Sequence, residues 1–299
     1  MVLIRGAGDL ASGVALRLHR AGFGVVMTDI ARPTALRRMA SFSSAIPNGE
    51  FAVEGVRAIL ANDTRAAREI VSEGNIAVVV DPEARVADEL APLALVDVIM
   101  AKRNLGTRMS DAPIVICAGP GFTAGADCHA VVETQRGHSL GRVITSGSAA
   151  PNNGVPGSVG GHTHERILRA PADGVFVQML DIGARVEAGD VAGCVGGAPV
   201  MCRIGGVLRG ILSSGVKVHK GMKSGDVDPR CEPENCFTAS DKALAVGGGV
   251  LEAILSLGGF LRYQYGAGRV NYNSNQSYEW NLPAKKWLAR RTPDNRRDG

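Results

Sequence analysis

The stretch Val2-Leu-Ile-Arg5-Gly6-Ala-Gly8-Asp9-Leu10-Ala11-Ser-Gly13 decides the fold of the first half of the chain. A short apolar run ends in a glycine-rich turn, and the apolar residues after it recur at helical spacing. In such a strand–turn–helix unit the first glycine allows a tight turn, the second lets the backbone approach a phosphate, and a small residue permits close helix packing. The residues predicted to bind a phosphate-bearing ligand are therefore Gly6, Gly8, Asp9, Leu10 and Ala11.

A second apolar run, Phe23 to Thr28, ends in Asp29 about twenty residues after the glycines. A carboxylate at this place can bind a ribose hydroxyl, which predicts a Rossmann-like α/β domain. Two alternatives stay open. Asp9 would repel a pyrophosphate, so the crevice could be empty or used for something else. The arginines that follow the acid could hold a phosphate instead; they are Arg32, Arg37 and Arg38.

The alternation of strands and helices continues beyond residue 62. Helices are predicted over 64–72 and near 85–93, and strands over 76–80, 96–100 and 114–117. Runs of Val and Ile without polar alternation are typical of strands covered on both faces, as in a parallel sheet.

Two loops after these strands are expected to meet at the carboxyl edge of the sheet. Lys102 follows one strand, and Gly119, Gly121 and Thr123 follow the next. Backbone amides, a hydroxyl and a cation there could bind a phosphate or a carboxylate, although Lys102 could equally belong to an ordinary solvated loop.

The residues that follow carry most of the candidate catalytic groups. These are Asp127, Cys128, His129, Glu133 and His138. If a helix begins near Asp127, His129 and Glu133 share one face and could act as ligands or as an acid–base pair; otherwise Asp127 caps the helix and the other two pair ordinarily. Cys128 is either a nucleophile or a packed thiol. We assign no metal site.

Residues 146–165 are rich in glycine, proline and small polar residues, which predicts a linker between a first domain over 1–145 and a second over 166–230. The second domain contains an internal repeat, because 173–189 align without gaps on 205–221. This duplication predicts two similar halves of short strands. The spacing resembles the biotinyl and lipoyl carriers, whose fold is a barrel-sandwich hybrid. Ala198 to Cys202, at the expected hairpin, lacks the attachment lysine of those carriers.

A C-terminal helical segment is predicted over 231–260, with one helix over 242–257 that Gly247 to Gly249 either break or pack closely. Residues 261–299 hold every Tyr and Trp of the chain and a charge of +5, which leaves −1 for residues 1–260 out of the net +4. The composition of 261–299 predicts a disordered tail. The charge gives no reason to expect nucleic-acid binding by 1–260.

The chain begins without the basic segment and cleavage site of an export signal, and no apolar run is long enough to span a bilayer. We therefore expect a cytoplasmic protein with no membrane partner.

Seven collinear motifs make the chain similar to the YqeB family. They are the segments 4–13, 18–22, 119–125, 133–138, 205–210, 225–230 and 240–243. Members of this family are accessory proteins of selenium-dependent molybdenum hydroxylase systems, so the resemblance implies a maturation factor with the hydroxylase as its partner. A molybdopterin-type or nucleotide ligand would bind in the Rossmann crevice. The alternatives are an NAD(P)-dependent oxidoreductase that uses His129 or His138, and a non-enzymatic scaffold that docks on the hydroxylase.

Overall fold

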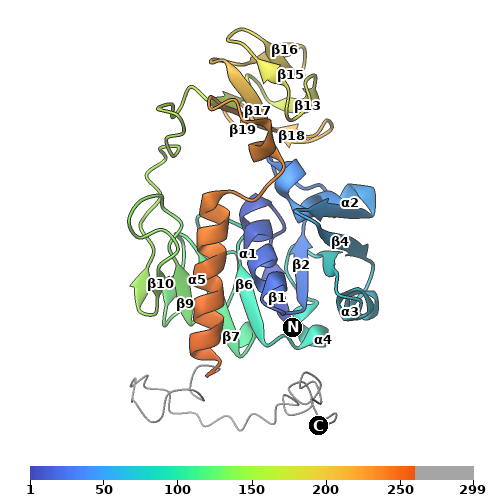
Figure 1. Cartoon of the computed structure of the whole chain (residues 1–299), viewed down its shortest axis with the longest axis vertical. Helices are drawn as coiled ribbons and strands as arrows, with labels where there is room; N and C mark the ends of the chain where they lie inside the picture. The colour runs from blue at the N-terminus through green and yellow to red at the C-terminus, as the bar shows by residue number, and fades with distance from the viewer. Residues whose placement is uncertain (260–299) are drawn as a thin grey trace, which may run out of the picture. The chain divides into compact units, whose positions relative to one another are not determined.

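The structure is a computed structural model that describes residues 1–259. Its main sheet has nine strands in the order β10-β9-β7-β6-β1-β2-β5-β4-β3 (Figure 1). The strands are β1 (Val2–Arg5), β2 (Val25–Asp29), β3 (Glu50–Val53), β4 (Val56–Ala61), β5 (Ile76–Val80), β6 (Ala94–Asp97), β7 (Ile114–Ala118), β9 (Ala130–Val132) and β10 (Val143–Ile144). Only β3 and β10 run antiparallel to their neighbours. The predicted parallel sheet is confirmed.

The chain reverses direction across the sheet at β1, which pairs with β2 on one side and with β6 on the other. In open α/β sheets, ligands bind beyond the carboxyl ends of the strands at this point. The strand order therefore predicts a ligand site at the loops that follow β1, β6 and β7.

Two long helices cover one face of the main sheet. They are α1 (Asp9–Arg20) and α5 (Asp241–Leu257), whose buried side chains share one core with β1 and β6. The other face is covered by α3 (Thr64–Ser72) and α4 (Ala87–Leu90), while the short α2 (Ala45–Asn48) lies beside β3 and β4. The core strands are apolar on both faces for this reason.

Glycines let α1 and α5 approach each other closely. A Cβ atom on Gly13 would lie 2.4 Å from the Cβ of Ala243, and one on Gly247 would lie 2.9 Å from the carbonyl oxygen of Gly13. The two helices run in the same direction, so both N-termini face the same end of the sheet (Figure 1). The glycines of α5 therefore serve packing and do not break the helix.

Residues 167–228 form two antiparallel four-stranded sheets, with orders β12-β19-β17-β14 and β16-β15-β13-β18. Their bounds are β12 (Ile167–Arg169), β13 (Gly174–Gln178), β14 (Arg185–Val186), β15 (Val191–Val195), β16 (Ala198–Met201), β17 (Gly206–Ile211), β18 (Lys217–Val218) and β19 (Lys223–Asp228). Each sheet takes one short strand from the other half of the repeat. Matching glycines keep matching backbone: φ is +97° at Gly183 and +89° at Gly215.

Several predicted elements are wrong in place or type. Residues 123–133 form no helix; they hold β8 (Thr123–Ala124), which pairs with β11 (Gly147–Ser148), and then β9. The strand expected over 96–100 ends at Asp97. Residues 198–201 form β16, and the hairpin turn lies before it at Gly196 and Gly197, where φ is positive.

The β3–β4 hairpin, which Glu54 and Gly55 connect, was not predicted. The tail predicted over 261–299 lies outside the described residues. Within the described part of the chain, no helix has both the length and the apolar character needed to cross a membrane.

Candidate functional site

The glycine turn after β1 is built as the sequence predicts. Gly6 has φ +104°, and a Cβ atom there would lie 3.0 Å from the carbonyl oxygen of Val98, so glycine is required for both conformation and space. Gly8 is the N-cap residue of α1 and provides no side-chain cap. The first-turn amides of Asp9, Leu10 and Ala11 are therefore left without a capping partner, which suits an anion.

Asp29, at the end of β2, supports this turn. Its Oδ2 atom accepts a hydrogen bond of 2.9 Å from the Ala7 N–H, and its Oδ1 atom accepts one of 2.8 Å from the Ile30 N–H. Burial raises the pKa of Asp29, although these two bonds act in the opposite direction. The carboxylate predicted to bind a ribose thus already holds the turn in place.

The Asp9 carboxylate is paired with Arg37 at 3.3 Å. The other end of the Arg37 guanidinium donates to the carbonyl oxygens of Asn235 and Thr238, both at 2.8 Å. Arg37 therefore connects α1 to the segment before α5, and it offsets the negative charge of Asp9 at the helix N-terminus.

A second wall of the site is the loop after β6, which the buried Arg5 anchors. Its guanidinium donates to Asp97 at 3.4 Å, to the Thr107 hydroxyl at 2.9 Å and to the Leu105 carbonyl oxygen at 3.1 Å. Lys102 lies on this loop with φ +63° and is exposed.

The glycines after β7 pack against this loop. A Cβ atom on Gly121 would lie 2.6 Å from the backbone nitrogen of Arg103, and one on Gly119 would lie 3.4 Å from the side chain of Met100. Because Gly6 contacts Val98 on the same loop, the structure brings together the turns after β1, β6 and β7.

Thr123 and Asp127 stabilise the turn after β7. The Asp127 Oδ2 atom accepts the Thr123 N–H at 2.8 Å, its Oδ1 atom accepts the Asn104 side-chain amide at 3.1 Å, and the Thr123 hydroxyl bonds to that of Ser148 at 2.9 Å. Neither predicted role of Asp127 in a helix is found, because β8 and its turn occupy this segment.

Glu133 and His129 do not pair with each other. Glu133 is buried and accepts backbone N–H groups of Thr134, Gln135 and Ala150 at 2.7 to 2.8 Å, so it joins the end of β9 to the linker. The Nδ1 atom of His129 accepts the Val115 N–H at 3.0 Å, and burial lowers the pKa of His129. His138 is exposed to solvent.

The thiol of Cys128 is fully buried beside that of Cys117. The neighbouring Cys128 thiol, together with burial, raises the pKa of Cys117 well above its usual range. Nucleophilic cysteines need accessible thiolates, so this pair has the character of packed thiols.

Sequence reasoning missed the cations nearest to the glycine turn. Lys242, in the first turn of α5, lies within electrostatic range of Asp9, Glu133 and Arg136, and also of Lys223 on β19. Neither lysine side chain makes a hydrogen bond or an ion pair within residues 1–259. Burial is the main cause of the lowered pKa of both, even though Lys223 keeps an exposed surface.

No sequence pattern links Lys242 or Lys223 to residue 9, because they are more than two hundred positions away. The start of α5 is nevertheless visible in the sequence as Ser240-Asp241, and the Ser240 hydroxyl does accept the Ala243 N–H.

The crevice thus combines the uncapped start of α1, the glycine turns and two unpaired lysines. We call Gly6 to Ala11, Lys223 and Lys242 the anion crevice. In the described residues, no group of three or more His, Cys, Asp or Glu side chains is placed to hold a metal ion. The carboxylates predicted as acids or bases are bonded to backbone N–H groups. The site can therefore bind an anion, and the side chains around it hold its shape.

Comparison with known proteins identifies the family. No family model matches the chain. The curated "Uncharacterized protein YqeB" of Escherichia coli (strain K12) is 51% identical over 257 residues, which cover 86% of this chain and 48% of that protein. The matched part of the chain belongs to the YqeB family. The chain spans about half the length of this relative.

Similarity to solved structures is low. An aspartoacylase family protein from Mesorhizobium loti is 12% identical, with a TM-score of 0.24 and coverage of 57% of this chain and 83% of that one. A succinylglutamate desuccinylase/aspartoacylase from Rhodobacter sphaeroides is 16% identical, with a TM-score of 0.24 and coverage of 76% and 84%. Scores this low support no argument about fold or function.

Proposed function

We propose that this chain is a maturation factor for a selenium-dependent molybdenum hydroxylase, and that its anion crevice binds a molybdopterin-type or nucleotide ligand through a phosphate group. The observation that carries the ligand proposal is that Lys242, the neighbour of Ala243 that packs against Gly13 of α1, lies within electrostatic range of Asp9 in the uncapped first turn of α1. The hydroxylase system is proposed from the resemblance to the YqeB family, and the Rossmann-like domain and barrel-sandwich hybrid are the fold interpretations that go with it.

The residues present fit the phosphate group of such a ligand. Three first-turn amides and two ammonium groups can each donate to phosphate oxygens. Asp9 would oppose an anion, but its pairing with Arg37 reduces that repulsion.

Binding is better supported than catalysis. Glu133 and Asp127 accept backbone N–H groups, and His129 accepts the Val115 N–H, so each would have to break a structural bond to move a proton. These contacts weigh against a nicotinamide-dependent oxidoreductase that uses His129 as its acid or base.

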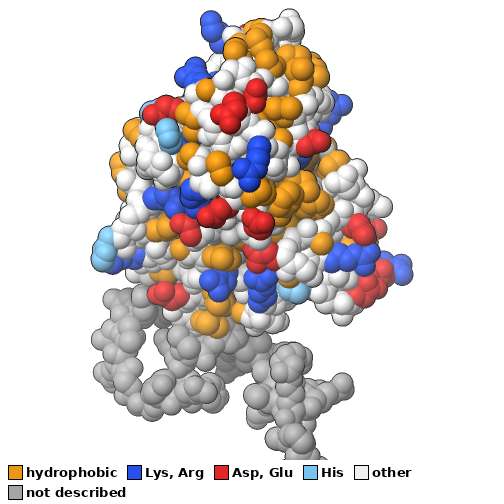
Figure 2. Space-filling model, turned by 45° about the horizontal axis from the view of Figure 1, so that its top comes forward, with side chains coloured by type: hydrophobic (Ala, Val, Ile, Leu, Met, Phe, Trp, Pro, Cys, Tyr) orange, Lys and Arg blue, Asp and Glu red, His pale blue; other side chains and the backbone are white. Residues whose placement is uncertain are grey.

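A docking role for the second domain has separate support. The sheet of β13 and β16 exposes four large apolar residues. Their exposed fractions are 48% for Val175, 45% for Val177, 59% for Met179 and 48% for Met201. Figure 2 shows hydrophobic side chains over this end of the molecule, at the top of the view. A patch of this kind is typical of a protein-binding surface, and the hydroxylase is the proposed partner.

Titration of the purified chain with molybdopterin, NAD⁺ and NADP⁺ tests the ligand proposal, and micromolar binding of one of them is the expected result. Failure of all three to bind would remove it. For the docking role, a Val177→Asp, Met179→Asp variant should lose co-purification with the hydroxylase, while Lys220→Asp on the same domain should keep it. Equal recovery by both variants would remove the docking role.

A further inference from the structure

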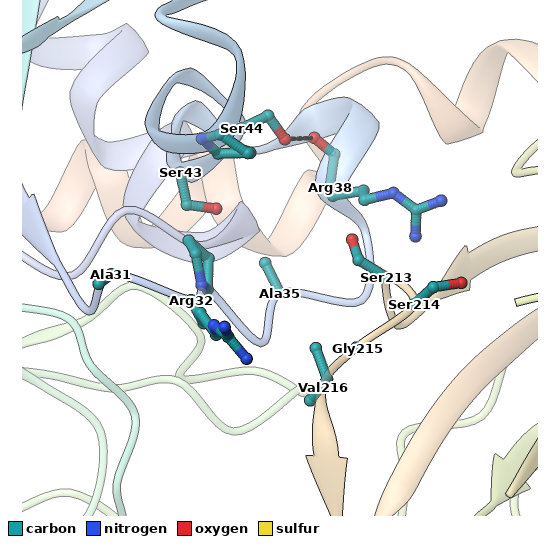
Figure 3. A pocket seen from close by; sticks show the side chains of 12 residues that line it. Ala31, Arg32, Ala35, Arg38, Ser43, Ser44, Ser213, Ser214, Gly215 and Val216 are labelled. Carbon is teal, nitrogen blue, oxygen red and sulfur yellow. Dashed lines mark hydrogen bonds between the residues drawn. The ribbon is translucent and has the colours of Figure 1, made fainter. Parts of the chain in front are cut away.

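A pocket lies between the loop after β2 and the hairpin that precedes β18, and its lining includes none of the residues of the anion crevice. Its volume is about 320 Å³. The first wall comes from residues 31–47 and the second from residues 213–216, as Figure 3 shows. The backbone N–H of Ser43 donates to the carbonyl oxygen of Ala7, and a Cβ atom on Gly8 would lie 4.0 Å from that of Ala35, so this pocket adjoins the glycine turn on the side of the loop after β2.

Three polar side chains of the pocket have no partner among the described residues. Arg32 is exposed and makes no ion pair there. The hydroxyl of Ser43, a residue only 1% exposed, has no hydrogen-bond partner, and Ser213 donates to none. A buried hydroxyl without a partner is unfavourable, so it is available to bond to a ligand. In Figure 3 the Ser43 hydroxyl points toward Ala35 and Ser213, into the space between the two walls.

The remaining polar groups of the pocket already serve the contact between its walls. Arg38 donates to the Ile211 carbonyl oxygen and, at 2.7 Å, to the Gln178 side chain. Ser44 donates to the Arg38 carbonyl oxygen at 2.6 Å, and Ser214 accepts the Gln178 N–H at 2.9 Å. Arg38 therefore fixes the second wall against the first, and the free donors remain for a ligand.

The rest of the lining is apolar and the pocket is small. Its apolar side chains are Ala31, Pro33, Ala35, Pro47 and Val216. Small-molecule sites have volumes of roughly 300 to 1,000 Å³ and combine an apolar lining with a few placed polar groups. This volume suits a ligand of modest size.

We infer that this pocket binds a phosphomonoester with a small organic group. A phosphate offers three acceptor oxygens, one for each of the three free side chains Arg32, Ser43 and Ser213, whereas a carboxylate offers two. The organic group would lie against the two prolines and Val216. Because residues 213–216 belong to the second domain, such a ligand would contact both parts of the chain at once.

Amide chemical shifts in the full-length chain can locate the binding, with adenosine 5′-monophosphate and inorganic phosphate as the probes. We expect adenosine 5′-monophosphate to shift the amides of residues 32–44 and 213–216, and inorganic phosphate to shift the same amides more weakly. Adenosine alone should shift them at least tenfold less. Arg32→Gln should weaken binding about tenfold or more, and Ser213→Ala should weaken it several-fold; both positions are accessible enough for folding to survive.

Two control variants separate this site from the anion crevice. Lys242→Ala removes a crevice cation and should leave the shifts at 213–216 unchanged, and Lys102→Ala should do the same. If neither phosphate compound shifts these amides, or if Arg32→Gln binds as the wild type does, the inference is wrong. If Lys242→Ala abolishes the shifts at 213–216, the phosphate binds in the crevice alone and the inference is equally wrong.

Discussion

The Oδ2 atom of Asp29 accepts a hydrogen bond of 2.9 Å from the backbone N–H of Ala7. The carboxylate that ends β2 thereby fixes the glycine turn that ends β1, and the amide at the centre of that turn is not available to a ligand. The anion must therefore be bound by the amides of the first turn of α1 and by the lysines around it.

Asp29→Asn should destabilise the chain and weaken ligand binding. An asparagine has one acceptor oxygen, so it can serve either the Ala7 or the Ile30 N–H, and the other loses its partner. We expect a loss of about 1 to 3 kcal/mol in the free energy of unfolding at pH 7. Urea denaturation measures it, and an unchanged midpoint would show that the two bonds contribute nothing.

Adjacent glycines of α5 should respond oppositely to alanine. A Cβ atom on Gly249 would lie 2.1 Å from the carbonyl oxygen of Gly141, whereas nothing lies within 4 Å of one on Gly248. Gly249→Ala should cost about 1 to 3 kcal/mol through overpacking. Gly248→Ala should stabilise the helix by up to about 1 kcal/mol. The melting temperature should be lower than that of the wild type for Gly249→Ala and higher for Gly248→Ala. Equal shifts of both in one direction would contradict the packing described.

The ion pair of Arg136 with Asp241 should make stability depend on acid pH. Its bidentate hydrogen bonds lower the pKa of Asp241 to about 2. A lowered carboxyl pKa adds stability that is complete above the unfolded value of about 4 and is lost as the pH falls through about 2.

Asp241 is 72% exposed, so the contribution should be only about 0.5 kcal/mol. The difference in stability between wild type and Asp241→Asn should shrink from pH 5 to pH 2. The exposed pair of Arg65 with Glu69 offers a control in Glu69→Gln. A difference that stays constant with pH would rule out the pair as its source.

Thiol labelling should distinguish packed cysteines from reactive ones. Cys231 is exposed, while Cys117 and Cys128 are buried, and the Cys128 thiol together with burial raises the pKa of Cys117. At pH 8 a thiol reagent should modify Cys231 rapidly in the folded chain and reach the buried pair only after unfolding. Mass spectrometry after a short exposure to the reagent locates the label. Rapid modification of Cys128 would contradict its packed state and support its role as a nucleophile.

The sequence was most informative where local pattern and tertiary environment agree. The predicted bounds of α3 and β5 match the structure, because a capping Asp63 precedes one and an unbroken apolar run forms the other. The β3–β4 hairpin had a visible signal in Glu54-Gly55, both with positive φ, but this pair is a weaker indicator than Asn-Gly.

The helix expected near Asp127 failed because pairing with β7 decided the outcome. Ala130 to Val132 are fully buried as β9 beside β7, and this pairing outweighs the helical compatibility of Ala and Glu nearby. The lysines of the crevice could not be found from sequence for another reason. Lys223 and Lys242 lie within electrostatic range of Asp9 only because β19 and α5 return to the carboxyl end of the sheet.

The most direct test of the anion crevice is a calorimetric titration of Lys242→Ala. Molybdopterin, NAD⁺ and NADP⁺ are titrated into the wild type, Lys242→Ala and the exposed control Lys220→Ala. We predict that the ligand bound by the wild type binds Lys242→Ala about tenfold or more weakly, as expected for loss of a charge-assisted hydrogen bond, and binds Lys220→Ala normally. As the pH rises, the affinity of the wild type should begin to fall at a pH below the ordinary pKa of lysine, because burial lowers the pKa of Lys242. Equal affinity of Lys242→Ala and wild type would contradict the account.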